Sequence, residues 1–270
     1  MIALTRSGAR SGTRPGARGT AGGGRVPLLL AVSSLHLRHG PIPALQDVSF
    51  EVTQGSTTAI VGSNGAGKTS VLRAITGLVR PSAGSIRFRG QELVGLPGHR
   101  ICNLGIAHVA EGRQLFPTMS VRENLELGAA PGRAQAGRGA RLERVLALFP
   151  RLVEVIDLDV GLLSAGKQQM VAIGRCLMAR PELILFDEPT RGLSPVLARQ
   201  MFQLIGTLAT ENITIILAEQ NVLAALRLAD SAHILDRGRI VLSGSGLGLL
   251  EDPRVREAYL GEGSFTPEPA

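Results

Sequence analysis

Hydrophobic and polar residues alternate along two stretches near the beginning of the chain. Residues 28–37 and 48–52 follow this two-residue period, which is typical of strands with one buried face. Three other stretches, 57–61, 183–186 and 213–217, are short and continuously hydrophobic, as parallel strands buried on both faces are. Helical spacing separates these runs, so strands and helices alternate, and the sequence predicts an α/β fold.

Helical signals dominate two further parts of the chain. After the 57–61 run, apolar residues recur at helical spacing, and Gly77 near the end is a stop signal. These apolar residues are Val71, Leu72, Ile75 and Leu78. Between 119 and 163 strand signals vanish, which predicts a mostly helical insert interrupted by a loop at 129–141. The segment 241–270 is predicted to finish in a short helix and a proline-containing tail, and no internal repeat is visible.

The first 27 residues differ in composition from the rest. They are rich in Gly, Arg, Ser and Thr and nearly free of apolar residues, which predicts disorder. They lack the apolar stretch of a secretory signal, and their glycines disfavour the amphipathic helix of a mitochondrial transit peptide. A translation start near Val26 is the alternative. On either interpretation, we expect removal of residues 1–27 to leave activity unchanged.

Composition excludes several functional classes. The chain has 270 residues, of which 44% are hydrophobic and 19% charged, so it can bury a core. Aromatic residues make up 3%, too few for a platform that stacks single-stranded nucleic acid. Cys102 and Cys176 lie far apart, which argues against a disulfide framework or a metal site. No apolar run reaches the roughly 18 residues of a membrane span.

The net charge of +7 does not indicate a nucleic-acid partner. Five arginines and no acidic residue lie within residues 1–27, so the remaining chain is nearly neutral. Charge alone is weak support for nucleic-acid binding, and a solvated basic segment explains it. We therefore expect no nucleic-acid partner.

A phosphate-binding loop is the strongest motif in the sequence. Residues 62–69 fit the pattern G-x-x-x-x-G-K-[ST], with a predicted strand before them and a predicted helix after them. Backbone N–H groups of such a loop and the positive end of the helix dipole surround a phosphate. The expected nucleotide-binding residues are Gly62, Ser63, Asn64, Gly65, Ala66, Gly67, Lys68, Thr69 and Ser70. Lys68 is expected to reach the β- and γ-phosphates and Thr69 to ligate Mg²⁺.

The lysine of this loop is unusual for the chain. Only Lys68 and Lys167 are lysines, among 29 basic residues, so arginine is the usual basic residue elsewhere. A compact ammonium group suits a phosphate cradle better than a planar guanidinium. The alternative, an ordinary glycine-rich turn, does not account for a lysine at this position.

Two carboxylates end one of the predicted buried strands. Asp187 and Glu188 directly follow the apolar run 183–186, and ligands of open α/β sheets bind at such strand ends. We expect Asp187 to hold Mg²⁺ and Glu188 to act as general base on the attacking water. Alone, the pair could be an acidic strand-end cap. About 120 residues after a P-loop, it indicates the second half of a nucleotide site.

A third segment has the pattern of a helix start. Ser164 is the expected N-cap, followed by the small residues Ala165 and Gly166 and a helical run to Met178. Such a terminus can bind phosphate. A capped helix without a ligand is the simpler interpretation of the same residues.

In their order and spacing, these segments resemble the ATP-binding subunits of ABC transporters. The resemblance spans residues 28–261 and rests on the P-loop, on 163–167 and on Asp187-Glu188-Pro189-Thr190. More narrowly, the chain is similar to the LivF type of bacterial high-affinity branched-chain amino acid importer. The stretches behind this narrower similarity are 110–113, 115–117, 123–125, 127–128, 148–152, 168–175, 219–221 and 258–261.

The resemblance implies a fold and a set of partners. The implied fold is a P-loop NTPase cassette at 28–261 with a RecA-like core, an antiparallel β subdomain and a helical subdomain at about 115–165, followed by a tail at 262–270. Two ATPase subunits, different or identical, are expected to sandwich two ATP molecules with Mg²⁺. They drive two transmembrane permease subunits, and an extracytoplasmic binding protein delivers the substrate. The expected place is the cytoplasmic face of the bacterial cell membrane.

The resemblance also implies roles for single residues. His39 takes the position of the aromatic ring that stacks on adenine, and Glu111 that of the glutamine that senses Mg²⁺. Gln220 takes the position of the switch histidine and is expected to act in catalysis beside Glu188. Ser164, Ala165 and Gly166 are expected to contact the nucleotide held by the partner subunit.

Two residues depart from the family pattern. Ala165 stands where the family has Gly, and Lys167 where it usually has Glu or Gln. A side chain at 165 would be strained if its φ were positive or if its Cβ faced the γ-phosphate, at a cost of about 1–3 kcal/mol, which corresponds to a roughly 10–100-fold slower site. We therefore expect the site served by this segment to be slower than the site that contains Lys68 and Glu188.

Other interpretations remain open at this stage. The cargo could be urea, a short amide or another metabolite, because the ATPase subunit does not touch it. A non-transport ABC ATPase acting on ribosomes or DNA usually has two cassettes in one chain or a long coiled-coil insert, and neither is visible. A weakly active subunit that only completes a dimer is disfavoured by Glu188.

Overall fold

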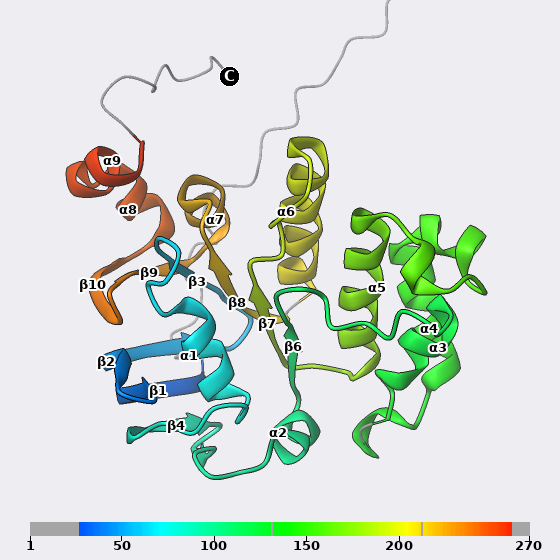
Figure 1. The fold of residues 1–270 in the computed structure, drawn as a ribbon, viewed down its shortest axis with the longest axis horizontal. Coiled ribbons are helices and arrows are strands. Elements are labelled where there is room, and N and C mark those ends of the chain that lie inside the picture. Colours follow the sequence, from blue (N-terminus) through cyan, green and yellow to red (C-terminus); the bar gives the residue numbers. More distant parts are fainter. Residues whose placement is uncertain (1–26, 131, 212, 261–270) are drawn as a thin grey trace, which may run out of the picture.

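The computed structural model describes residues 27–130, 132–211 and 213–260. The predicted tails at 1–27 and 262–270 therefore lie outside the described residues, except for Pro27. Two sheets and nine α-helices make up this part of the chain (Figure 1). None of its helices is both long enough and apolar enough to cross a bilayer.

The first sheet is antiparallel and has the strand order β2-β1-β4-β5. Its strands are β1 (Leu28–His39), β2 (Ile42–Thr53), β4 (Ala83–Phe88) and β5 (Gln91–Glu92). Buried and exposed residues alternate along β1 and β2, as the sequence predicts for strands with one buried face.

The second sheet has six strands in the order β10-β9-β3-β8-β7-β6. They are β3 (Thr57–Val61), β6 (Ile106–Val109), β7 (Leu183–Asp187), β8 (Thr214–Glu219), β9 (Ser231–Asp236) and β10 (Arg239–Gly244). All are parallel to their neighbours except β10, which is antiparallel to β9. Every residue of β3, β7 and β8 is buried, which confirms the interpretation of their continuous apolar runs.

Helices cover both faces of this sheet (Figure 1). They are α1 (Lys68–Ile75), α2 (Gly98–Leu104), α3 (Val121–Leu127), α4 (Arg138–Leu148), α5 (Ala165–Met178), α6 (Pro195–Thr210), α7 (Val222–Leu228), α8 (Gly246–Glu251) and α9 (Pro253–Leu260). Short 3-10 turns lie at Gly132–Ala134, Pro150–Val155 and Val160–Leu162. The region 115–165 contains helices and turns, with α3 and α4 beside α5 and away from α1.

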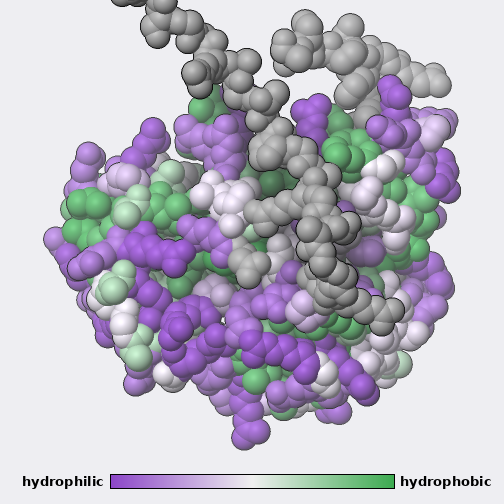
Figure 2. Space-filling model, turned by 180° about the vertical axis from the view of Figure 1, so that it is seen from behind, coloured by the Kyte–Doolittle hydropathy of each residue, from purple (hydrophilic) through white to green (hydrophobic). Residues whose placement is uncertain are grey.

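Two hydrophobic cores meet at the parallel sheet. Ile184 and Phe186 belong to the core shared with α3–α7, whereas Leu183 and Leu185 face the core around α1 and the antiparallel sheet. Successive residues of β7 thus serve opposite cores, because side chains alternate across a strand. On the face drawn in Figure 2, hydrophobic residues lie in separate patches among hydrophilic ones.

The structure corrects three details of the sequence interpretation. Leu78 lies beyond α1 and is 65% exposed, because the chain leaves the helix through Gly77 at φ +70°. Helix α4 begins at Arg138, inside the stretch predicted as a loop. Segment 241–270 begins in strand β10, and two helices follow instead of one.

Candidate nucleotide site

The P-loop connects β3 to α1, and the backbone geometry explains why glycine occupies several of its positions. A Cβ atom on Gly62 would lie 2.2 Å from the backbone oxygen of Leu235, so a side chain there would clash. Gly67 has φ +110°, a conformation that side chains disfavour, and Gly65 has φ +79°. No atom lies within 4 Å of a Cβ placed on Gly65, so the loop is open on that side. This arrangement leaves room for a phosphate.

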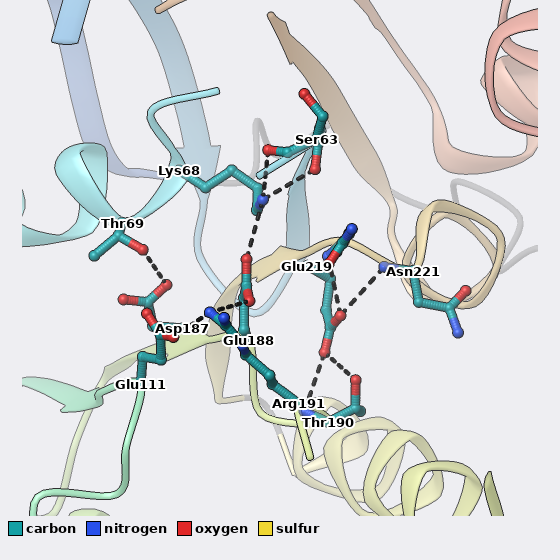
Figure 3. A network of polar contacts seen from close by, with 12 residues as sticks. Ser63, Lys68, Thr69, Glu111, Asp187, Glu188, Thr190, Arg191, Glu219 and Asn221 are labelled. Carbon is teal, nitrogen blue, oxygen red and sulfur yellow. Dashed lines mark hydrogen bonds and ion pairs between the residues drawn. The ribbon is translucent and has the colours of Figure 1, made fainter. Parts of the chain in front are cut away.

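Lys68 is the first residue of α1, and its side chain is only 3% exposed. Its Nζ atom donates to the backbone oxygens of Gly62 at 2.9 Å and Ser63 at 3.1 Å. The same atom lies 3.1 Å from Oε1 of Glu188, and that carboxylate is equally buried (Figure 3). A buried ammonium group is therefore held between the P-loop and the end of β7.

The next residue, Thr69, reaches the other carboxylate. Its hydroxyl donates to Oδ1 of Asp187 at 2.9 Å (Figure 3). The pKa of Asp187 is raised to about 6, mainly by burial and also by the nearby charges of Glu111 and Glu188, while the hydrogen bond from Thr69 opposes the rise. A hydroxyl and a carboxylate at this distance are the oxygen ligands that Mg²⁺ prefers, and the cation would relieve the crowding of negative charge. The residues present therefore fit a nucleotide with Mg²⁺.

Glu188 stands at the turn after β7 with φ +47°, an uncommon conformation for a residue other than glycine. Its backbone N–H donates to the oxygen of Ala218 at 2.9 Å, which fixes the turn to β8. The second oxygen of its carboxylate lies 3.4 Å from Nη1 of Arg191. Arg191 also pairs with Glu111, so this guanidinium connects two of the expected site carboxylates (Figure 3).

A fourth carboxylate, that of Glu219, organises the loops around the site. It ends β8, is 2% exposed, and burial raises its pKa. It accepts hydrogen bonds from the Thr190 hydroxyl at 2.6 Å and from the backbone N–H groups of Gln220 at 3.1 Å and Asn221 at 3.3 Å. The loops after β7 and β8 are thereby held together, beside a cleft of about 300 Å³ that reaches Glu188.

Sequence reasoning missed Glu219 and Arg191 as members of this network. Glu219 could have been recognised from the sequence. It follows the apolar run 213–217 and Ala218, so it ends a buried strand as Asp187 does. No sequence signal marks Arg191. Gln220, the expected catalytic partner, is exposed, and among the described residues it donates a hydrogen bond to Glu219 through its backbone N–H and none through its side chain.

His39 lies near the start of α1, as the resemblance requires. It is the last residue of β1, it is exposed, and its Nε2 atom lies 3.1 Å from the hydroxyl of Ser70. An exposed ring beside the P-loop helix is available for stacking. The expectation that it contacts adenine stays a prediction.

The segment 164–166 is not brought to this site. In Figure 1, α5 and α1 lie on opposite sides of β6 and β7, and no hydrogen bond or ion pair joins residues 164–166 to the P-loop in the part of the chain that the structure describes. Ser164 has the N-cap position predicted for it, but its side chain accepts no hydrogen bond from the helix. Ala165 is the first helical residue and has no positive φ, so the expected backbone strain at this position is absent. Gly166 is buried, and a Cβ atom placed on it would lie 3.0 Å from the side chain of Leu197.

Comparisons with known proteins agree with this geometry. The family model described as "ABC transporter" matches residues 45–191. The "High-affinity branched-chain amino acid transport ATP-binding protein BraG" of Pseudomonas aeruginosa is 44% identical over 86% of this chain and 100% of its own length. The "Probable branched-chain amino acid transport ATP-binding protein LivF" of Archaeoglobus fulgidus is 33% identical over 86% of this chain and 99% of its own.

Two solved structures are similar in fold along most of the chain. One is the ADP conformation of an ATP-binding cassette of an ABC transporter, with a TM-score of 0.75, 27% identity, and coverage of 87% of this chain and all of that one. The other is a nucleotide-free cassette from an ABC transporter, with a TM-score of 0.76, 27% identity and the same coverage. Both are ABC cassettes, which confirms the predicted fold class.

Proposed function

The chain belongs to the ABC transporter family of ATP-binding proteins, and from this premise we propose that it hydrolyses ATP to drive an importer of branched-chain amino acids. The cluster of Lys68, Thr69, Asp187 and Glu188 carries the ATPase part of the proposal. The amino-acid part rests on the relatives, because the BraG protein of Pseudomonas aeruginosa matches over its whole length.

We assign the roles at this site from the contacts of each side chain. Lys68 would exchange its bonds to the carbonyl oxygens of Gly62 and Ser63 for bonds to the β- and γ-phosphates of ATP. Thr69 and Asp187 would hold Mg²⁺, with Glu111 close enough to raise the pKa of Asp187. The metal supplies charge neutralisation at the phosphate oxygens.

Glu188 is the proposed general base. Its carboxylate pairs with Lys68 here, and a Lys68 engaged by phosphate would leave that carboxylate oxygen to accept a proton from water. The cleft beside Glu188, lined also by Gln220 and Asn221, provides space for such a water. Gln220 borders this space, which supports its proposed part in catalysis.

The start of α5 is proposed to serve a second nucleotide, held by a partner ATPase subunit. Ser164 is exposed, and the neighbouring Leu162 is 78% exposed. Since α5 lies across β6 and β7 from α1, which follows the P-loop, a nucleotide that uses both helix starts needs two subunits. The partner is either a different ATPase subunit or a second copy of this chain. In this proposal the cassette spans residues 28–261, and the helical region at about 115–165 positions α5.

An apolar groove is the proposed contact with a permease subunit. It has a volume of about 530 Å³ and runs between α2, α3 and α5. Three of its residues are large and exposed, namely Leu78 at 65%, Phe116 at 50% and Leu127 at 40%. Apolar surface of this kind marks interaction sites, and a short cytoplasmic helix of a permease fits it. The protein would thereby be held at the cytoplasmic face of the membrane, and an extracytoplasmic binding protein would act through the permease.

Uptake by reconstituted vesicles tests the function. We expect the purified complex in liposomes to accumulate leucine, isoleucine and valine only with ATP and Mg²⁺ present. Uptake of urea or acetamide in place of the amino acids would replace the proposed substrate class but keep the ATPase. ATP hydrolysis without uptake of any of them would favour a non-transport ATPase.

A single substitution tests the permease groove. Leu127→Glu places a charge in the groove, so we expect it to reduce recovery of the permease with the tagged ATPase by at least about tenfold. The matched control is Leu247→Glu, because Leu247 is 67% exposed and does not line the groove. Both variants should bind ATP normally, and equal recovery from both would reject the groove as the docking site.

A further inference from the structure

A further cavity lies at the opposite end of the parallel strands from the nucleotide site. It has a volume of about 740 Å³, within the usual range for small-molecule sites. Glu182, directly before β7, lines it, whereas Asp187 ends the same strand at the P-loop. Glu182 and Asp187 are five positions apart along extended chain, which corresponds to about 17 Å. The cavity is therefore distinct from the site proposed for ATP.

Arginines dominate the charge of this cavity. Arg133, Arg141, Arg144 and Arg180 line it, against the carboxylates of Glu182 and Glu211. Both carboxylates are already engaged: Arg133 lies 2.9 Å from Glu182, and Arg144 pairs with Glu211. Arg89 also pairs with Glu182. The lining thus carries more positive than negative charge, and no carboxylate in it is left for the remaining two arginines.

Arg141 and Arg180 are those two arginines. Arg141 donates to the backbone oxygens of Met178 at 3.1 Å and Ala136 at 2.6 Å, but its buried Nη2 atom has no hydrogen-bond partner among the described residues. Arg180 forms no ion pair within the part of the chain that the structure describes. Burial and the charge of Arg180 both lower the pKa of Arg141. Like charges are crowded here, and a bound anion would relieve that crowding.

The rest of the cavity wall is apolar. Val145 and Leu148 of α4, Leu177 of α5, Leu208 of α6 and Ile213 before β8 all line it. A bare inorganic ion would leave this apolar surface without a contact. Guanidinium groups form bidentate hydrogen bonds with carboxylates and phosphates. The apolar wall would contact a hydrocarbon group of the same ligand.

We propose that this cavity binds a small organic anion that carries a carboxylate or phosphate at one end and a short hydrocarbon group at the other. The oxyanion would contact Arg141 and Arg180, and the hydrocarbon would pack on Leu148 and Leu177. Because the lining comes from α4, from α5 and residues 180–182 after it, and from Leu208, Glu211 and Ile213, the ligand would join these parts of the chain. This site is independent of the proposed transport function.

Calorimetric titration of the full chain with matched probes tests the proposal. The probes are 3-methylbutanoate and 3-methylbutyl phosphate, with acetate lacking the hydrocarbon and 3-methylbutan-1-ol lacking the charge. We expect saturable binding of at least one of the first two, at least about tenfold tighter than either control probe. Whichever of the two binds more tightly identifies the oxyanion. Equal binding of acid and alcohol, or no binding of any probe, would overturn the proposal.

Variants locate the binding. Arg180→Gln should weaken it at least about tenfold, and Ala147→Phe, which fills the cavity from α4, should weaken it too. Arg227→Gln is the matched control, because Arg227 is an exposed arginine on α7 that does not line the cavity. Lys68→Ala should keep the affinity. Loss of binding in Lys68→Ala would place the probe at the P-loop, and unchanged binding in both cavity variants would likewise reject the site.

Discussion

Helices α1 and α5 of this chain both have small residues at their N-terminal ends, Gly67 before α1 and Ser164 and Ala165 at the start of α5, yet the two N-termini are built very differently. At α1, Lys68 is buried and contacts both the P-loop and Glu188, and Thr69 bonds to Asp187. At α5, Ser164 is exposed and its hydroxyl accepts no hydrogen bond from the helix. Both termini offer free N–H groups to an anion, but only the first has carboxylates and a cation arranged around it.

The difference teaches that a helix N-terminus is only part of a catalytic site. Charged groups that stabilise a transition state must be fixed before the reaction, and at α1 they are fixed by contacts between β3, β7 and β8. The start of α5 has no comparable neighbours among the described residues, so its proposed phosphate contact depends on a second subunit. We therefore expect substitutions at α1 to have large effects and substitutions at α5 small ones.

Lys68→Ala should have the most severe overall effect, because it impairs both ATP binding and turnover. It removes the cation that would bind the phosphates and leaves Glu188 buried without its nearest charge partner. We expect weak ATP binding and a fall in turnover of at least about 10²–10³-fold, the scale for losing one charge-stabilising donor. Nucleotide binding and phosphate release by the purified complex measure both effects. Near-normal turnover would reject the P-loop assignment.

Glu188→Gln should separate binding from hydrolysis. The amide keeps the shape of the side chain but cannot accept a proton, so turnover should fall by about 10²–10⁴-fold, the scale of general-base catalysis. ATP binding should persist, because Lys68 and Thr69 are unchanged. Glu257→Gln on α9 is a control of the same chemistry away from the site. Normal hydrolysis by the Glu188 variant would show that another group activates the water.

The residues that the sequence proposes for the α1 site are recognisable because they belong to local patterns. The P-loop glycines, the strand before them and the helix after them occupy one continuous stretch, and the run 183–188 sets both carboxylates at a strand end. The resemblance placed Glu111 and Gln220, which no local pattern marks.

The missed parts depend on tertiary contacts. Arg191 belongs to the site only because the turn after β7 brings it to Glu111 and Glu188. Strands β6 and β9 are harder to recognise in the sequence because the partly buried His108 and His233 interrupt their short apolar runs. Leu78 has helical spacing, and only the backbone at Gly77 shows that the helix ends before it.

Arg191→Ala should have a moderate effect at the α1 site. The guanidinium pairs with Glu111 and Glu188, but 55% of its side chain is exposed, and exposed ion pairs contribute about 0.2–1 kcal/mol. We expect turnover to fall by less than about fivefold. Arg191→Lys should restore part of the loss, while Arg199→Ala on α6 should change nothing. A loss beyond about 100-fold would mean that Arg191 contacts the reacting groups.

Ala165→Gly and Lys167→Glu should have the smallest effects, since they alter the N-terminus of α5, which has no carboxylates arranged around it. Without a positive φ at Ala165, the backbone strain behind the expected roughly 10–100-fold slower site is absent, and only a Cβ that faces the partner's phosphate would still slow that site. What remains is one methyl group, and glycine costs a helix about 0.5–1 kcal/mol, so turnover should change by less than about threefold. Lys167→Glu should stabilise α5 slightly through the helix dipole but repel a phosphate at its end. Turnover of the complex with each variant, beside the melting temperature, separates these contributions. A tenfold gain from Ala165→Gly without a change in melting temperature would mean that its Cβ faces the partner's phosphate, and the two termini would then be more alike in function than in structure.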